Sequence, residues 1–131
     1  MTSFKITGGT PLKGAVRLGG AKNASFKLMI AAALGVGESR LLNMSNIGDV
    51  EVTYKTLEAI GVAVSRPGDN TVYIVGDNLS TDTIPSFTGE KTRAATLFAG
   101  LLLHKKHRAI IPLPGGCSLG ERPVDRHLEG F

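Results

Sequence analysis

A chain of 131 residues with 42% hydrophobic residues and no tryptophan is large enough for one modest domain, or for part of a larger one. Its net charge of +4 comes from scattered lysines and arginines, which favours attraction for small anions over a nucleic-acid surface. A single cysteine excludes an internal disulfide and fits a reducing compartment. The amino terminus contains no long apolar run, so we expect neither a secretory signal nor a membrane span, and a cytoplasmic location.

The first half of the chain predicts alternating strands and helices. Short strands over residues 4–7 and 15–18 are joined by turn residues at 8–11. A helix, a strand, a second helix and two further strands follow, and the last two flank a turn at Pro67 and Gly68. The expected ranges of these five elements are residues 21–34, 39–44, 50–60, 62–65 and 71–75.

The second half repeats this order. A second apolar helix is expected over residues 90–103, a strand over 108–113, and a helix from Pro123 onward. Four pairs recur at one constant offset: Lys22 and Lys91, Leu28 and Leu97, Ala31 and Gly100, Leu34 and Leu103. The later helices match at a longer offset, which places an insertion at the loop that carries the cysteine. The sequence thus predicts a mixed α/β chain of the α+β class, built from unit one (21–76) and unit two (87–131).

The second unit ends before the two strands that close the first unit. The apolar surface of the second unit would then lack the strands that should cover it. We therefore expect the chain to be the amino-terminal part of a longer protein, with the second unit truncated.

The cysteine lies on a glycine-rich loop, residues 114–125. Arg122 and the positive end of a helix starting at Pro123 would favour the ionised thiol of Cys117. The three glycines of the loop let backbone N–H groups approach an anion. The alternative is that Cys117 is a small buried apolar residue.

Three separated motifs stand in order along the chain: Gly20-Ala21-Lys22-Asn23-Ala24, Lys91-Thr92-Arg93-Ala94, and the whole segment 114–125. Together they resemble UDP-N-acetylglucosamine enolpyruvyl transferases. The resemblance implies the enolpyruvyl transferase fold of repeated β-α-β-α-β-β units, with residues 1–20 belonging to a second domain and 21–131 forming an incomplete first domain. The related shikimate-3-phosphate enolpyruvyl transferases are the nearest alternative, but they lack such a cysteine loop and typically have serine where Asn23 stands.

The resemblance implies transfer of the enolpyruvyl group of phosphoenolpyruvate to the 3-hydroxyl of UDP-N-acetylglucosamine, with release of phosphate and without a cofactor. This reaction is the first committed step of peptidoglycan synthesis, and so serves cell-wall biogenesis, cell shape and cell division. By resemblance Cys117 is the proton donor and the target of fosfomycin. The base that takes the sugar hydroxyl proton would lie beyond Phe131, so residues 1–131 alone are expected to be inactive.

The resemblance also assigns the substrate contacts. The residues implied for phosphoenolpyruvate are Lys22, Asn23 and Arg122. Those implied for UDP-N-acetylglucosamine are Asn23, Arg93, Arg122, Pro123, Val124, Asp125 and Arg126, the last through its backbone. Each has a simpler interpretation as well: Lys22 as a solvated lysine, Asn23 as a helix cap, Asp125 as compensation of a helix dipole.

Other classes of function and site are less well supported. An anion- or nucleic-acid-binding module would lack stacking aromatic residues, and a thiol switch would lack a second cysteine. The histidines and the cysteine lack metal-ligand spacing, and the basic cluster at 104–108 fits a helix end. Four aspartates are expected in loops without a link to the site: Asp49, Asp69, Asp77 and Asp82.

Overall fold

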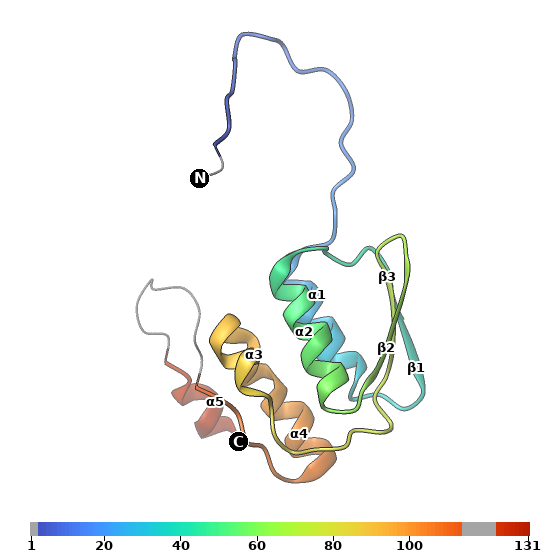
Figure 1. Cartoon of the computed structure of the whole chain (residues 1–131), viewed down its shortest axis with the longest axis vertical. Coiled ribbons are helices and arrows are strands. Elements are labelled where there is room, and N and C mark those ends of the chain that lie inside the picture. The colour runs from blue at the N-terminus through green and yellow to red at the C-terminus, as the bar shows by residue number, and fades with distance from the viewer. Residues whose placement is uncertain (1–2, 114–122) are drawn as a thin grey trace.

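A computed structural model describes residues 3–113 and 123–131, apart from the side chain of Arg93. Unit one forms a three-stranded antiparallel sheet, in the order β1-β3-β2, with helices packed on one face (Figure 1). Its elements are α1 (Lys22–Ala32), β1 (Glu38–Leu41), α2 (Gly48–Ala59), β2 (Ala63–Gly68) and β3 (Thr71–Val75). The predicted order of helix, strand, helix, strand and strand is therefore confirmed, and so is the α+β class.

The sheet exists because β3 supplies both of its neighbours with partners. Ile74 pairs with Ser39 of β1 and with Val64 of β2, and its side chain is buried against the helices. The adjacent Tyr73 points to the opposite face, as the alternation of a strand requires. There the guanidinium of Arg40 lies 5.8 Å from the centre of the Tyr73 ring.

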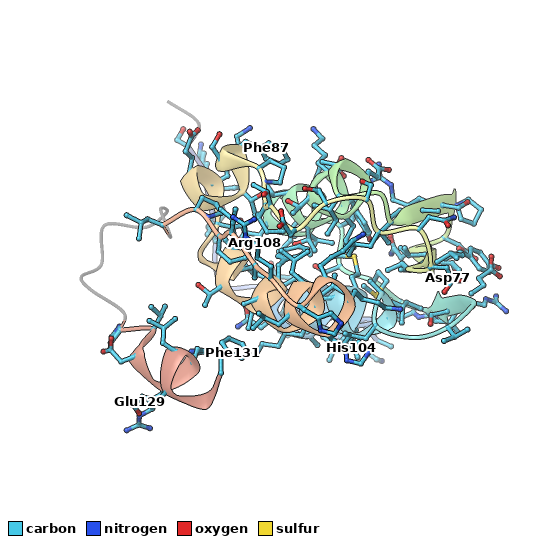
Figure 2. The ribbon with its side chains drawn as sticks, turned by 90° about the horizontal axis from the view of Figure 1, so that it is seen from below. Asp77, Phe87, His104, Arg108, Glu129 and Phe131 are labelled. Atoms are coloured by element: carbon cyan, nitrogen blue, oxygen red, sulfur yellow. The ribbon has the colours of Figure 1, made fainter. Side chains whose placement is uncertain are left out.

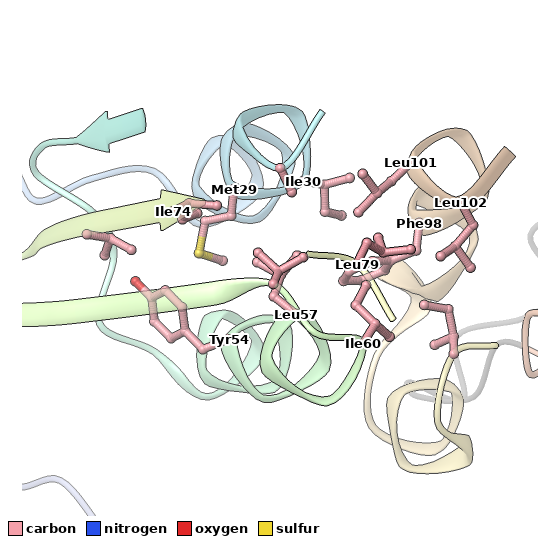
Figure 3. Packing of buried hydrophobic residues seen from close by; sticks show 14 of the residues in the cluster. Met29, Ile30, Tyr54, Leu57, Ile60, Ile74, Leu79, Phe98, Leu101 and Leu102 are labelled. Carbon is pink, nitrogen blue, oxygen red and sulfur yellow. The ribbon is translucent and has the colours of Figure 1, made fainter. Parts of the chain in front are cut away.

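The hydrophobic core lies between the sheet and the helices. Figure 3 shows Met29 of α1, Leu57 of α2 and Ile74 of β3 converging in this layer, while Phe98 and Leu101 extend the core away from the sheet. All five residues are at most 1% exposed, so α1 buries one face between the sheet and the next helical segment while its other face stays exposed. This burial is the main stabilising contribution available to a unit of this size.

The helix expected over residues 90–103 is broken, so the prediction of one continuous helix is wrong. The structure has α3 (Ser86–Lys91), the 3-10 helix η1 (Arg93–Leu97) and α4 (Phe98–Lys106). Thr92 interrupts them in an extended conformation, with φ −148° and ψ 148°, and its side-chain oxygen accepts a hydrogen bond from the backbone N–H of Ala94. Local capping by threonine thus competes with helix continuation.

The later elements of unit two are shorter than expected. In place of a strand over 108–113, the described chain has an isolated parallel bridge between Thr83 and Ile110. The final helix, α5 (Asp125–Gly130), begins two residues after Pro123, with Val124 as its N-cap. The strand prediction is wrong. Among the described residues, Ile110 forms backbone hydrogen bonds only with the segment 82–84, which is not itself a strand, so no ladder of strand pairs can extend from it.

Residues 3–20 form no strand, so the strands predicted over 4–7 and 15–18 are wrong for this structure. Within the described residues no strand lies beside them to pair with, and a strand needs such a partner for its hydrogen bonds. The apolar side chains that prompted the prediction stay exposed, for example Phe4 at 92% and Ile6 at 89%. Their assignment to a second domain stays a prediction.

Substitution of Gly76 tests how closely β3 approaches α1. A Cβ at Gly76 would overlap the backbone of Ala33, which cannot move without shifting the helix end. We expect Gly76→Ala to lower the free energy of unfolding in urea by about 1–3 kcal/mol. Gly100→Ala is the matched control: Gly100 lies inside α4 with open space at its Cβ position, and we expect that change to stabilise by about 0.5–1 kcal/mol. Equal effects of the two substitutions would contradict the close approach.

Candidate functional site

The amino-terminal end of α1 is exposed and carries no side-chain cap. Lys22 and Asn23 are its first two residues, and the N-cap, Ala21, adopts φ −72° and ψ 130°. The backbone N–H groups of a first helical turn have no partner within the helix, and α1 has no acidic residue there to compensate them. Asn23 lies inside the helix, so its interpretation as the cap is wrong. This helix end suits an anion.

Lys22 forms an ion pair with Asp49, the second residue of α2. The side chains are 49% and 38% exposed, so both groups remain open to solvent. The expectation that Asp49 lies in a loop is therefore wrong, because Asp49 is a residue of α2. The sequence did contain a signal for the helical position of Asp49. It follows Gly48 and precedes an apolar pattern of helical spacing, and acidic side chains are favoured in first helical turns.

The loop over residues 42–47 holds the starts of α1 and α2 together. The backbone N–H of Ser45 donates to the buried Oγ of Ser25 at 3.0 Å, and the N–H of Met44 donates to the carbonyl oxygen of Asn70 at 2.8 Å. A side chain at Gly20 would overlap the carbonyl of Asn43, so glycine is required at that position. The loop is thus fixed to α1 and to the β2–β3 turn.

In unit two, the helical segment that begins at Arg93 starts at the same end of the domain as α1. Near the carboxyl ends of α1 and α4, the Nζ of Lys105 donates to the carbonyl of Gly35 at 3.3 Å. Ile30 of α1 and Leu101 of α4 lie together in the core (Figure 3). The two helices therefore run in the same direction, and η1, which begins at Arg93, contacts α1. The structure thus brings the backbone of Arg93 to the same end of the domain as Lys22.

The remaining predicted site residues lie in the segment 117–126, only part of which the structure describes. Cys117 and Arg122 lie outside the described residues. Figure 2 shows α5, marked by Glu129 and Phe131, at the edge of the molecule, and none of its residues is buried. Within the described residues, no hydrogen bond or ion pair joins the segment 123–126 to Lys22 or Asn23. Asp125 is the first residue of α5, so its proposed roles in dipole compensation and in substrate binding both stay open.

Two other polar clusters involve neither Lys22 nor Asn23. An open hollow of about 320 Å³ is lined by Ser80, Thr81, Asp82 and Lys106, the last residue of α4. It is therefore at the opposite end of that helical segment from Arg93. On α2, Glu51 accepts a hydrogen bond from Arg66 at 2.6 Å, which raises the pKa of that guanidinium, and burial raises the pKa of the neighbouring Tyr54 hydroxyl. Arg66 also lies over the Tyr54 ring at 4.5 Å, so this cluster joins β2 to α2.

Within residues 3–113 and 123–131, no group of three or more histidine, cysteine, aspartate or glutamate side chains is arranged to hold a metal ion. In the same ranges no helix has the length and apolar character needed to cross a membrane.

Residues 6–131 match the family described as EPSP synthase (3-phosphoshikimate 1-carboxyvinyltransferase), and the chain therefore belongs to that family. It is 38% identical over 131 residues to the UDP-N-acetylglucosamine 1-carboxyvinyltransferase of Idiomarina loihiensis, covering 100% of this chain and 31% of the relative. It is 39% identical to the enzyme of that name from Sorangium cellulosum, with the same coverage. The resemblance expected from the three motifs is confirmed. The chain spans about a third of the length of these curated relatives.

A solved structure with the same fold is that of the enolpyruvyl transferase NikO from Streptomyces tendae. The TM-score is 0.64 at 24% sequence identity, and the match covers 73% of this chain and 22% of that one. This likeness confirms the fold, and at that identity it carries no statement about substrates.

The buried Oγ of Ser25 gives a direct test of how the site is held. Ser25→Ala leaves the N–H of Ser45 without its acceptor, and we expect the free energy of unfolding to fall by about 1–3 kcal/mol. Hydrogen exchange at the Ser45 amide should accelerate. Ser86→Ala, at the exposed first position of α3, is the control and should change stability by less than about 0.5 kcal/mol. Unchanged exchange at Ser45 would contradict the assigned hydrogen bond.

Proposed function

We propose that the protein containing this chain transfers the enolpyruvyl group of phosphoenolpyruvate to the 3-hydroxyl of UDP-N-acetylglucosamine. The observation that carries the proposal is the similarity over 100% of the chain to proteins with the name UDP-N-acetylglucosamine 1-carboxyvinyltransferase. The exposed, uncapped start of α1 supports it, because the helix end and Lys22 offer positive potential to a phosphate or a carboxylate.

In the proposed reaction, the oxygen of the sugar hydroxyl attacks the phosphate-bearing carbon of phosphoenolpyruvate while the Cys117 thiol gives its proton to the methylene carbon. A base takes the hydroxyl proton. The tetrahedral adduct then loses a methyl proton and expels inorganic phosphate, which restores the double bond as an enol ether. A thiol suits proton donation because nearby positive charge tunes its pKa towards the operating pH.

The anionic groups of phosphoenolpyruvate call for cationic partners. We assign these roles to Lys22 and Arg122, with Asn23 as a polar contact to both substrates. Lysine offers a compact charge and arginine a planar pair of donors. For the nucleotide sugar we assign the residues Asn23, Arg93, Arg122, Pro123, Val124, Asp125 and Arg126. The position of η1 supports Arg93, since its backbone lies at the same end of the domain as Lys22.

With these substrates, the protein would act in peptidoglycan synthesis and so in cell-wall biogenesis, cell shape and cell division. Its location would be the cytoplasm, and fosfomycin would be an inhibitor. The family takes its name from 3-phosphoshikimate 1-carboxyvinyltransferase. Shikimate 3-phosphate is therefore the alternative acceptor to test beside UDP-N-acetylglucosamine. Phosphate release with the sugar nucleotide and none with shikimate 3-phosphate is the expected result.

Replacement of two matched lysines tests the specific role of Lys22. In the gene product that contains this chain, Lys22→Ala should lower kcat/KM for phosphoenolpyruvate roughly hundred-fold, about 3 kcal/mol of transition-state stabilisation. Lys91 occupies the corresponding repeat position but ends α3, and Lys91→Ala should have little effect. Steady-state phosphate release measures both. Comparable losses would mean that general positive charge, not a specific contact, is responsible.

Alkylation by fosfomycin tests the role of Cys117. We expect the intact gene product, with UDP-N-acetylglucosamine bound, to gain the mass of one fosfomycin, and Cys117→Ser to gain none. Cys117→Asp should retain turnover and resist alkylation, because a carboxylic acid can donate a proton but is not a thiolate nucleophile. Absence of the adduct on the unaltered protein would remove Cys117 from the site.

A further inference from the structure

Lys22, one of the two residues assigned to the anionic groups of phosphoenolpyruvate, already has an anionic partner in the structure. Its ammonium pairs with the carboxylate of Asp49 at the joined starts of α1 and α2. We infer that Asp49 is a specificity-determining residue of the proposed site: it competes with incoming anions for Lys22, so that the site binds anions of high charge and rejects weak ones. The inference rests on the proposed function, since it concerns the same lysine.

The carboxylate can act in this way because its backbone is fixed. The loop before α2 is held by the Ser45 to Ser25 hydrogen bond and by the close approach of Gly20 to Asn43. Asp49 is also stabilised where it lies, in the first turn of α2, by the partial positive charge of that helix end. The lysine side chain, in contrast, is long and about half exposed, so it is the partner that can turn to a ligand.

The effect of Asp49 on an anion follows from Coulomb's law. An anion that binds Lys22 must first displace the Asp49 carboxylate from it, and the loss of one pair of unit charges at about 4 Å in bulk water amounts to about a five-fold change in affinity. A phosphate dianion interacts with Lys22 and the helix ends more strongly than a monoanion does. Only an anion of that kind competes well with a carboxylate that is already in place.

Glu51 provides a matched control on the same helix. It too lies in the first turn of α2, but it pairs with Arg66 at 2.6 Å and with Lys55 at 4.0 Å. Asp49→Asn and Glu51→Gln each remove one negative charge from that turn, so they change the net charge and the helix dipole alike. Only Asp49→Asn removes the partner of Lys22. The comparison therefore separates direct competition from general electrostatics.

The test is titration of the purified protein with inorganic phosphate at low ionic strength, followed by calorimetry and by the amide resonance of Asn23. We expect Asp49→Asn to bind phosphate about five-fold more tightly than the unaltered protein, and Glu51→Gln to bind it within about two-fold. Asp49→Glu, which keeps the charge, should restore the original affinity. In the background of Lys22→Ala, Asp49→Asn should bring no gain. If Asp49→Asn does not fold, Asp49→Ser removes the same charge and suits a first helical turn.

An unchanged or weaker affinity in Asp49→Asn, an equal gain in Glu51→Gln, or a gain that persists without Lys22 would each overturn the inference. The turnover assay separates it from the proposed function. If the unaltered gene product shows no enolpyruvyl transfer but phosphate affinity responds to Asp49 as expected, the competition stands and the proposed function fails. If transfer occurs and phosphate affinity ignores Asp49, the proposed function stands and the competition fails.

Discussion

The contact that the site depends on is the close packing of the loop over residues 42–47 against the start of α1. Gly20 lies so near the carbonyl of Asn43 that a side chain would not fit, and Ser45 donates to the buried hydroxyl of Ser25. Without this contact the strand β1 would return to α2 at an undefined angle. With it, two helices start at one place, and the charged residues of both first turns come within reach of each other. The pairing of Lys22 with Asp49 is therefore a consequence of backbone packing, since the loop sets where the two helices begin.

Most of unit one could be predicted from the sequence because its information is local. The helix expected over 21–34 and the strand expected over 71–75 follow from an apolar pattern ended by turn residues, and the structure places them within two residues at each boundary. The strands expected over 4–7 and 15–18 failed because a strand is defined by its partner, which local sequence does not supply. The prediction of one continuous helix through Thr92 failed for another reason. The side-chain oxygen of Thr92 accepts a hydrogen bond from the N–H of Ala94, and this local cap outweighed the apolar pattern around it.

The site divides in the same way. Lys22 and Asn23 were found from a short motif, and the structure presents both at an exposed helix end. Asp49 was missed because its link to Lys22 is a contact between residues far apart in the chain, created by the loop that joins β1 to α2. Its position could be expected from helix-start rules, but its partner could not. Cys117 and Arg122 have the strongest motif in the sequence and lie outside the described residues, so their roles rest on resemblance alone.

The two copies of the repeat differ in which backbone donors they leave free. At the constant offset of the repeat, Thr92 corresponds to Asn23, yet Thr92 is the N-cap of η1 and its hydroxyl oxygen accepts from Ala94, while Asn23 lies inside α1 and no side chain caps that helix. The second copy has thus satisfied internally a backbone donor of the kind that the first copy leaves without a side-chain cap. A repeated plan of helices therefore does not produce two equivalent helix ends: the start of α1, with Lys22, is uncapped, whereas the start of η1 is capped by Thr92.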